Sequence, residues 1–177
     1  FKTGGVQAIG AMAYGTESVP KVYKIFGPGN QYVMAAKQQV ALYDVAIDMP
    51  AGPSEVCVIA DESCNPEYVA ADLLSQAEHG VDSQVILITT DAGMLQKVQE
   101  ALSCQLEALP RKDIAAKTLE NSKLILVANT QEAIDLSNVY APEHLIIATS
   151  DYKDLADKVV NAGSVFLGNF ACESAGD

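Results

Sequence analysis

The sequence predicts a protein of the α/β class with a mainly parallel sheet, and three observations support this. Short β-rich runs alternate with longer amphipathic segments along the 177 residues. Most of the short runs are almost continuously apolar, as strands buried on both faces must be. Cap residues and prolines stand where several of the longer segments begin. We therefore expect residues 1–177 to form a single, doubly wound, Rossmann-like α/β domain with helices on both faces of the sheet.

The expected strands, taken in order, are runs rich in Val, Ile and Leu. They are Val22–Phe26, Val56–Ala60, Gln84–Thr89, Leu124–Ala128, Leu145–Thr149 and Ser164–Leu167. The segments between them repeat apolar residues at helical spacing. They predict helices at Gly5–Tyr14, Asn30–Tyr43, Pro66–His79, Ala92–Leu109, Asp113–Leu119, Gln131–Val139 and Tyr152–Asn161. Helices that join parallel strands cross over in the right-handed sense.

Local start signals support three of these helices. Asn65 is a cap residue, Pro66 suits the first helical position, and Glu67 places an acid in the first turn. Thr130 and Ser150 stand in similar openings further along the chain. These signals predict where the third, sixth and seventh helices begin.

Composition excludes several classes of partner. The chain has 23 acidic and 11 basic residues, a net charge of −12. Binding to a nucleic acid or an anionic membrane needs clustered Lys and Arg, so we expect neither. No apolar run approaches the ~20 residues that a membrane-spanning helix needs.

The cysteines indicate a cytoplasmic protein. Four of them, without metal-site spacing, are too few to staple a domain of this size. We expect free thiols in a reducing cytosol. Because the chain starts at Phe1 and not at Met, we also expect it to be a piece of a longer protein.

Ligands of doubly wound sheets bind at the carboxyl ends of the strands, so the segments that follow strands are candidate ligand sites. These are Phe26–Asn30 and Gly168–Asn169. In Phe26–Asn30, two glycines allow close approach of the backbone, and the helix that follows favours an anion at its N-terminus. The segment matches neither GxGxxG nor a P-loop. A tight turn capped by Asn30 is the alternative, and both stay open.

Two further segments carry polar side chains. The loop Met49–Glu55 contains two prolines and presents Ser54 and Glu55, as rigid binding loops often do, although a plain surface turn would look the same. Gln76 and His79 are three residues apart, so we expect both to project from one face of a helix and to be able to chelate a metal. A histidine that interacts with the helix dipole is the alternative.

Glu143 and His144 place a carboxylate beside an imidazole. Both groups can act as general acid or base near neutral pH. A capping Glu with an incidental His is the alternative reading. Asp177, in a polar and small-residue terminus, is a reasonable metal ligand if it comes near His79.

Together these segments resemble histidinol dehydrogenase, and they occur in the order found in that family. The matching blocks are Gly4–Ile9, Ile25–Asn30, Ile47–Glu55, Asp72–Gly80, Pro142–Leu145 and Ser164–Asp177. The resemblance implies an oxidoreductase of histidine biosynthesis that depends on zinc and NAD. It oxidises L-histidinol through L-histidinaldehyde to L-histidine.

The resemblance also implies a zinc site and a substrate site. By similarity, Gln76, His79 and Asp177 match zinc ligands. The positions that contact substrate in the family are matched by Ser54, Gln76, His79, His144 and Asp177.

Cofactor and catalytic positions follow from the same similarity. Gln7 and Asn30 match positions that contact NAD. Glu143 and His144 match the two catalytic acid/base positions.

The family enzyme is longer on both sides, has two domains and works as a homodimer with one zinc per subunit. A fourth zinc ligand and one NAD contact lie in the parts that this chain lacks, so we expect residues 1–177 alone to be inactive. Two alternatives remain: a sister dehydrogenase on the same scaffold that oxidises another polar alcohol, such as a sulfonated diol, and a non-enzymatic α/β binding module.

Overall fold

The computed structural model describes residues 2–43, 45–48 and 54–172. The chain divides into two compact units, residues 1–52 and 53–177, and each is described by itself. The expectation of a single domain over residues 1–177 stays a prediction. Within the described ranges, no helix is both long and apolar enough to cross a membrane.

The first unit is built from two helices and two very short strands. Its elements are α1 (Gly5–Tyr14), β1 (Lys24–Ile25), α2 (Gln31–Ala41) and β2 (Ala46–Ile47). β1 and β2 pair in parallel, and the apolar core consists of Ile9, Ala13, Ile25, Val40 and Val45.

The first strand that the sequence predicts is therefore shorter than expected and lies outside the main sheet. Tyr23 and Phe26, on either side of β1, are 92% and 69% exposed, and within Val22–Phe26 only Ile25 is buried. A run that buries one side chain cannot form a central strand. The pairing partner β2 was not predicted.

The second unit contains a five-stranded sheet, which confirms the predicted fold class. Its elements are β3 (Glu55–Ala60), α3 (Pro66–Ala77), β4 (Gln84–Thr89), α4 (Ala92–Ala108), α5 (Lys112–Glu120), β5 (Lys123–Leu126), α6 (Thr130–Tyr140), β6 (His144–Ala148), α7 (Tyr152–Ala156) and β7 (Ser164–Leu167). The strand order is β5-β4-β3-β6-β7, and every pair is parallel.

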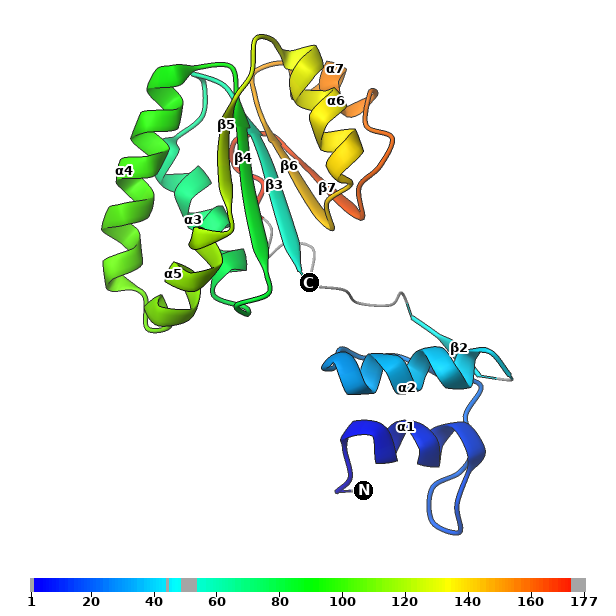
Figure 1. Cartoon of the computed structure of the whole chain (residues 1–177). Helices are drawn as coiled ribbons and strands as arrows, with labels where there is room; N and C mark the ends of the chain where they lie inside the picture. The colour runs from blue at the N-terminus through cyan, green and yellow to red at the C-terminus, as the bar shows by residue number, and fades with distance from the viewer. Residues whose placement is uncertain (1, 44, 49–53, 173–177) are drawn as a thin grey trace. The chain divides into compact units, whose positions relative to one another are not determined.

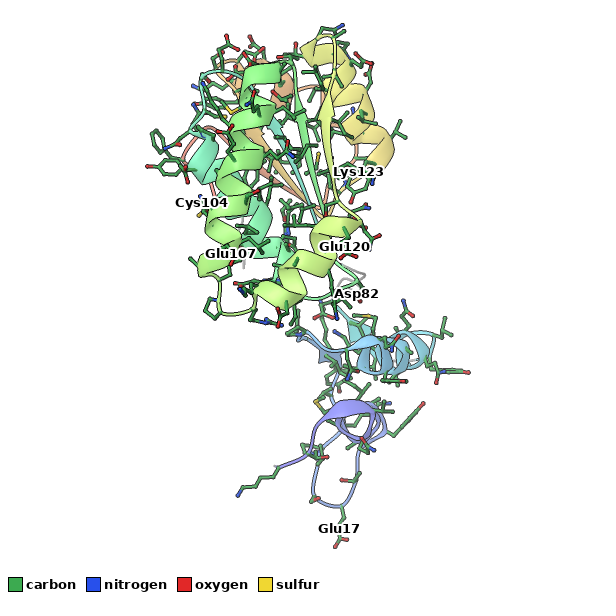
Figure 2. All side chains as sticks on the ribbon, turned by 60° about the vertical axis from the view of Figure 1, so that its left-hand side comes forward. Glu17, Asp82, Cys104, Glu107, Glu120 and Lys123 are labelled. Carbon is green, nitrogen blue, oxygen red and sulfur yellow. The ribbon has the colours of Figure 1, made fainter. Side chains whose placement is uncertain are left out.

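Helices cover both faces of this sheet (Figure 1). Successive side chains of a strand point to opposite faces. Val58 and Ile146 pack in the cluster beneath α3, α4 and α5, whereas Ile59 and Ile147 pack with α6 and α7. The far sides of α4 and α5 carry exposed charges such as Glu107 (Figure 2). Central strands buried on both faces explain the continuous apolar runs in the sequence.

The observed helix starts follow cap chemistry. The side chain of Asn65 accepts the N–H of Glu67 at 3.0 Å, which confirms the predicted start of α3. At α6 the cap is Asn129, whose side chain accepts the N–H of Glu132, and Thr130 is already helical.

The last helix is much shorter than the predicted 152–161. α7 ends at Ala156, and no side chain caps its start. Beyond it, the N–H groups of Lys158 and Val159 donate to the Leu155 and Ala156 carbonyls in a tighter turn. The Asn138 side chain then accepts the N–H groups of Val160 and Asn161 at 2.8 and 3.2 Å, so these two residues do not continue a helix. This contact comes from another helix and could not be read locally.

Candidate active site

Three candidate residues meet where β3 and β6 begin. Ser54 precedes β3, Glu143 precedes β6, and His144 is the first residue of β6. The two strands are neighbours, with Val56 opposite His144. The Ser54 hydroxyl donates to Glu143 Oε2 at 2.6 Å. The fold thus joins two residues that are 89 positions apart in the chain.

This edge is not the one that topology favoured from the sequence. The general rule points to the carboxyl ends of the strands. A cavity of about 670 Å³ does lie there, and Gly168 and Asn169 line it. Ser54, Glu143 and His144 lie instead at the amino ends, at the opposite edge of the sheet. The sequence already places these residues before their strands, so the rule for carboxyl ends does not apply to them.

The imidazole of His144 faces the side of the sheet on which α3 packs. His144 alternates with Ile146 and Ala148, which both belong to the cluster beneath α3. The ring of Phe166, from β7, lies edge-on to it with 5.9 Å between the ring centres. This packing holds the half-buried imidazole at the sheet edge.

The end of α3 reaches the same edge, since the chain continues from it into β4. Gln76 is completely buried, and its two amide atoms have no hydrogen-bond partner among the described residues. His79 is exposed, and its N–H donates to the Gln76 carbonyl at 3.2 Å. The helix ends at Ala77, two residues earlier than predicted, so His79 lies in a turn and not on the helical face expected from its spacing.

The chemistry of Gln76 and His79 fits a metal site in part. An imidazole nitrogen is a common zinc ligand, and an amide oxygen is a harder one. A buried amide without a partner costs about 1–3 kcal/mol, so a ligand for it would remove a penalty. Asp177, the third predicted ligand, lies outside the described residues. Within the described part of the chain, no three His, Cys, Asp or Glu side chains form a metal cage.

β7 fixes the backbone of Glu143 from the other side. The Ser164 N–H donates to the Glu143 carbonyl at 2.8 Å, and the Gly163 N–H donates to the Pro142 carbonyl at 3.0 Å. A Cβ on Gly163 would lie 2.6 Å from the Glu143 carbonyl oxygen. Only glycine fits there without a shift of the backbone. The sequence reasoning did not identify this role of Gly163.

Glu55 is a second carboxyl group at this edge, which the sequence placed in a candidate binding loop without indicating its neighbour. It precedes Val56, so the strand register places it beside Glu143. Burial raises the pKa of the Glu55 carboxyl, the backbone N–H of Glu143 opposes this rise, and the negative charge of Glu143 adds to it. The adjacent Ser54 and Glu55 at the start of β3 were a signal in the sequence. That Glu143 is the neighbour of Glu55 depends on strand order, which the sequence does not show.

The predicted cofactor contacts belong to the first unit. Gln7 lies exposed on α1. Asn30 caps α2, where its side-chain oxygen accepts the N–H groups of Tyr32 and Val33 at 3.1 Å each. This confirms the turn-and-cap reading and leaves anion binding as a prediction.

Two buried cysteines are unsuited to nucleophilic chemistry. Burial raises the pKa of the Cys57 thiol to about 12. Burial, with the nearby charge of Asp61, raises the pKa of the Cys64 thiol to about 11. Both are therefore neutral thiols near neutral pH.

Comparisons with known proteins agree with the sequence motifs. The family model described as "Histidinol dehydrogenase" matches residues 1–177. The chain is 70% identical over 177 residues to histidinol dehydrogenase of Bacteroides thetaiotaomicron, covering 100% of this chain and 41% of that protein. It is 58% identical over 179 residues to the Yersinia pestis protein of the same name, covering 100% and 40%.

Solved structures give the same result. Histidinol dehydrogenase from Elizabethkingia anophelis matches with a TM-score of 0.95 and 61% identity, over 99% of this chain and 40% of that one. Gamma-glutamyl phosphate reductase from Thermotoga maritima matches with a TM-score of 0.54 over 93% of this chain and 43% of that one. At 15% identity the second match shows a shared fold alone. The chain thus spans about two fifths of its relatives.

Proposed function

Because this chain belongs to the histidinol dehydrogenase family, we propose that it is part of an enzyme that oxidises L-histidinol through L-histidinaldehyde to L-histidine. The same membership supports NAD as the hydride acceptor, one zinc ion per subunit, and a homodimer in the cytoplasm. Residues 1–177 carry part of this site, and the chain alone is expected to be inactive.

One observation carries the proposal: a hydrogen-bonded acid and a histidine lie at the sheet edge where α3 ends. The Ser54–Glu143 hydrogen bond, at 2.6 Å, positions a carboxylate next to His144. At the same edge the buried amide of Gln76 lacks a partner among the described residues. An acid/base pair near a buried amide oxygen that could bind a metal is suited to an alcohol oxidation assisted by that metal.

We assign His144 to the oxidation of the alcohol and Glu143 to the oxidation of the aldehyde. In the first, the half-buried imidazole of His144 accepts the proton of the substrate alcohol as the carbon loses hydride. In the second, the Glu143 carboxylate, held by Ser54, takes a proton from the water that attacks the aldehyde carbon. The hydrated aldehyde then loses its hydride and becomes the carboxylate product. A base held in place before reaction makes proton transfer efficient.

Within this chain, the predicted zinc ligands belong to the second unit and the predicted NAD contacts to the first. Gln76, His79 and Asp177 would hold zinc, and Gln7 and Asn30 would contact NAD. When bound, zinc would help to orient the substrate, and NAD would take up the hydride.

The test uses the full-length protein with L-histidinol and, separately, L-histidinaldehyde, while NADH formation is followed. His144→Asn should lower turnover of the alcohol by about a hundredfold or more and leave the zinc content unchanged. Glu143→Gln should slow aldehyde oxidation. Glu107→Gln is the matched control, since Glu107 is exposed on α4 (Figure 2).

Three results would contradict the proposal. Loss of zinc in His144→Asn would make this residue a ligand and not a base. Aldehyde oxidation at the wild-type rate in Glu143→Gln would remove the water-activating role. Turnover of a sulfonated diol in place of L-histidinol would assign the protein to a sister enzyme.

A further inference from the structure

In the first unit, the side chains of Lys37 and Asp48 bind both backbone polar groups of Gly27, its N–H and its carbonyl. The Gly27 N–H donates to Asp48 Oδ2 at 2.7 Å. The Gly27 carbonyl accepts from Lys37 Nζ at 2.9 Å. Lys37 and Asp48 also form an ion pair with each other. The three residues thus form a closed ring of polar contacts.

The burial of Lys37 is unusual for a lysine. Its side chain is 1% exposed, whereas the partner Asp48 is 28% exposed. The hydrogen bond from Lys37 lowers the pKa of the Asp48 carboxyl, and that from Gly27 adds to the effect. A buried ion pair rarely stabilises a fold more than apolar residues of the same size would. The pair is therefore better explained by the conformation that it selects.

That conformation is the exit of the chain from β1. The ladder of β1 and β2 joins Lys24 to Ala46 and Ile25 to Ile47, and the N–H of Asp48 reaches the Ile25 carbonyl at 3.2 Å. Beyond this point the two strands no longer pair, and the Gly27 N–H donates to the side chain of Asp48 instead of to a backbone carbonyl.

The loop that follows is tightly constrained. Gly27 has a φ of +132°, which strongly favours glycine. A Cβ on Gly29 would lie 2.4 Å from Val33 Cγ1, so the loop packs directly on the first turn of α2. The loop ends at Asn30, whose Oδ1 caps α2. The Nδ2 group of Asn30 is then the side-chain atom that can donate to a ligand.

We propose that Lys37 and Asp48 are positioning residues for the dinucleotide site, because they hold the Gly27–Asn30 loop in the shape that presents Asn30 to NAD. This inference rests on the proposed function, which takes Asn30 as an NAD contact. Neither side chain touches the dinucleotide, and both act through the backbone of Gly27.

The experiment measures NAD affinity by calorimetry, and KM for NAD and for L-histidinol, in the full-length enzyme. Lys37→Met, Asp48→Asn and the double variant should each weaken NAD binding about tenfold, because each removes charge-assisted hydrogen bonds to the loop. KM for L-histidinol and the zinc content should not change. Lys97→Met, an exposed charge on α4, is the control.

The double variant separates positioning from simple stability. The double variant leaves no unpaired charge in the first unit's core. If the ion pair had a purely structural role, the double variant would recover both the melting temperature and the NAD affinity of the wild type. Recovery of affinity would overturn the inference. Recovery of the melting temperature with NAD affinity still low supports it, and it remains measurable if a single variant fails to fold.

Asn30→Asp distinguishes this inference from the proposed function. It keeps the oxygen that caps α2 and removes the amide donor. Weak NAD binding in Asn30→Asp with normal binding in the double variant would overturn the inference alone. Normal binding in Asn30→Asp would overturn the assigned contact, and normal binding in every variant would overturn both.

Discussion

Replacing Ser54 by Ala tests whether the serine positions Glu143, the carboxylate that we propose to be catalytic. The variant removes the hydroxyl that donates to Glu143 Oε2 at 2.6 Å and leaves the backbone at the start of β3 intact. This length is typical of an O–H group that donates to a charged carboxylate. Without it, the Glu143 side chain can rotate away from the position that the proposed water activation requires.

The expected loss follows from the burial of the pair. Hydrogen bonds to charged groups contribute about 1.5–3 kcal/mol, and each 1.4 kcal/mol corresponds to a tenfold change. Ser54 and Glu143 are both half-buried, so water can compensate for part of the loss. We therefore expect the lower end of the range, about a tenfold slower oxidation of L-histidinaldehyde.

The assay is single-turnover NADH formation from L-histidinaldehyde by the full-length enzyme. Ser54→Thr should retain most of the rate, since it keeps a hydroxyl. Ser103→Ala is the control, because the exposed Ser103 hydroxyl donates within α4, to the Gln99 carbonyl at 2.9 Å.

A double-mutant cycle decides the interpretation. If Ser54 acts through Glu143, the double variant with Glu143→Gln should be no slower than Glu143→Gln alone. Full additivity of the two losses would refute the reasoning and leave Ser54 as a substrate contact only.

Three further predictions concern Gln76, Glu55 and Asp61. Gln76→Leu should abolish zinc retention yet raise the melting temperature of the zinc-free protein, because it removes a buried amide that costs about 1–3 kcal/mol; a lower melting temperature would mean that the amide has a partner. Glu55→Gln should stabilise the protein increasingly as the pH rises above the ordinary range of glutamate pKa values. The reason is that the pKa of Glu55 is raised in the folded state, so the wild type loses stability as the carboxyl group ionises. An equal stabilisation at acid pH, measured by thermal unfolding, would contradict this. Asp61 accepts four hydrogen bonds from Ser63 and Ser150, which outweigh burial and lower its pKa. Asp61→Asn should therefore destabilise most at neutral pH, and thermal unfolding should show the difference shrinking as the pH falls and the wild-type carboxylate is protonated.

The sequence by itself determined the fold class and most of the elements. Continuous apolar runs such as Val56–Ala60 predict buried strands because a strand covered on both faces has no side chain left for water. The cap at Asn65 predicted the start of α3 because capping is a contact between near neighbours. The order of the motifs was enough to identify the family.

Only the tertiary structure decided which groups meet. Strand order and register bring Ser54 to Glu143 and Glu55 beside it, at the amino edge of the sheet and not at the carboxyl edge. A hydrogen bond from Asn138 of another helix holds Val160 in the segment predicted to be helical, and a buried ion pair of Lys37 with Asp48 shapes the loop before Asn30. Periodicity and capping report on residues within about one helical turn of each other. Contacts between distant segments depend on how the elements pack, and local pattern does not contain that information.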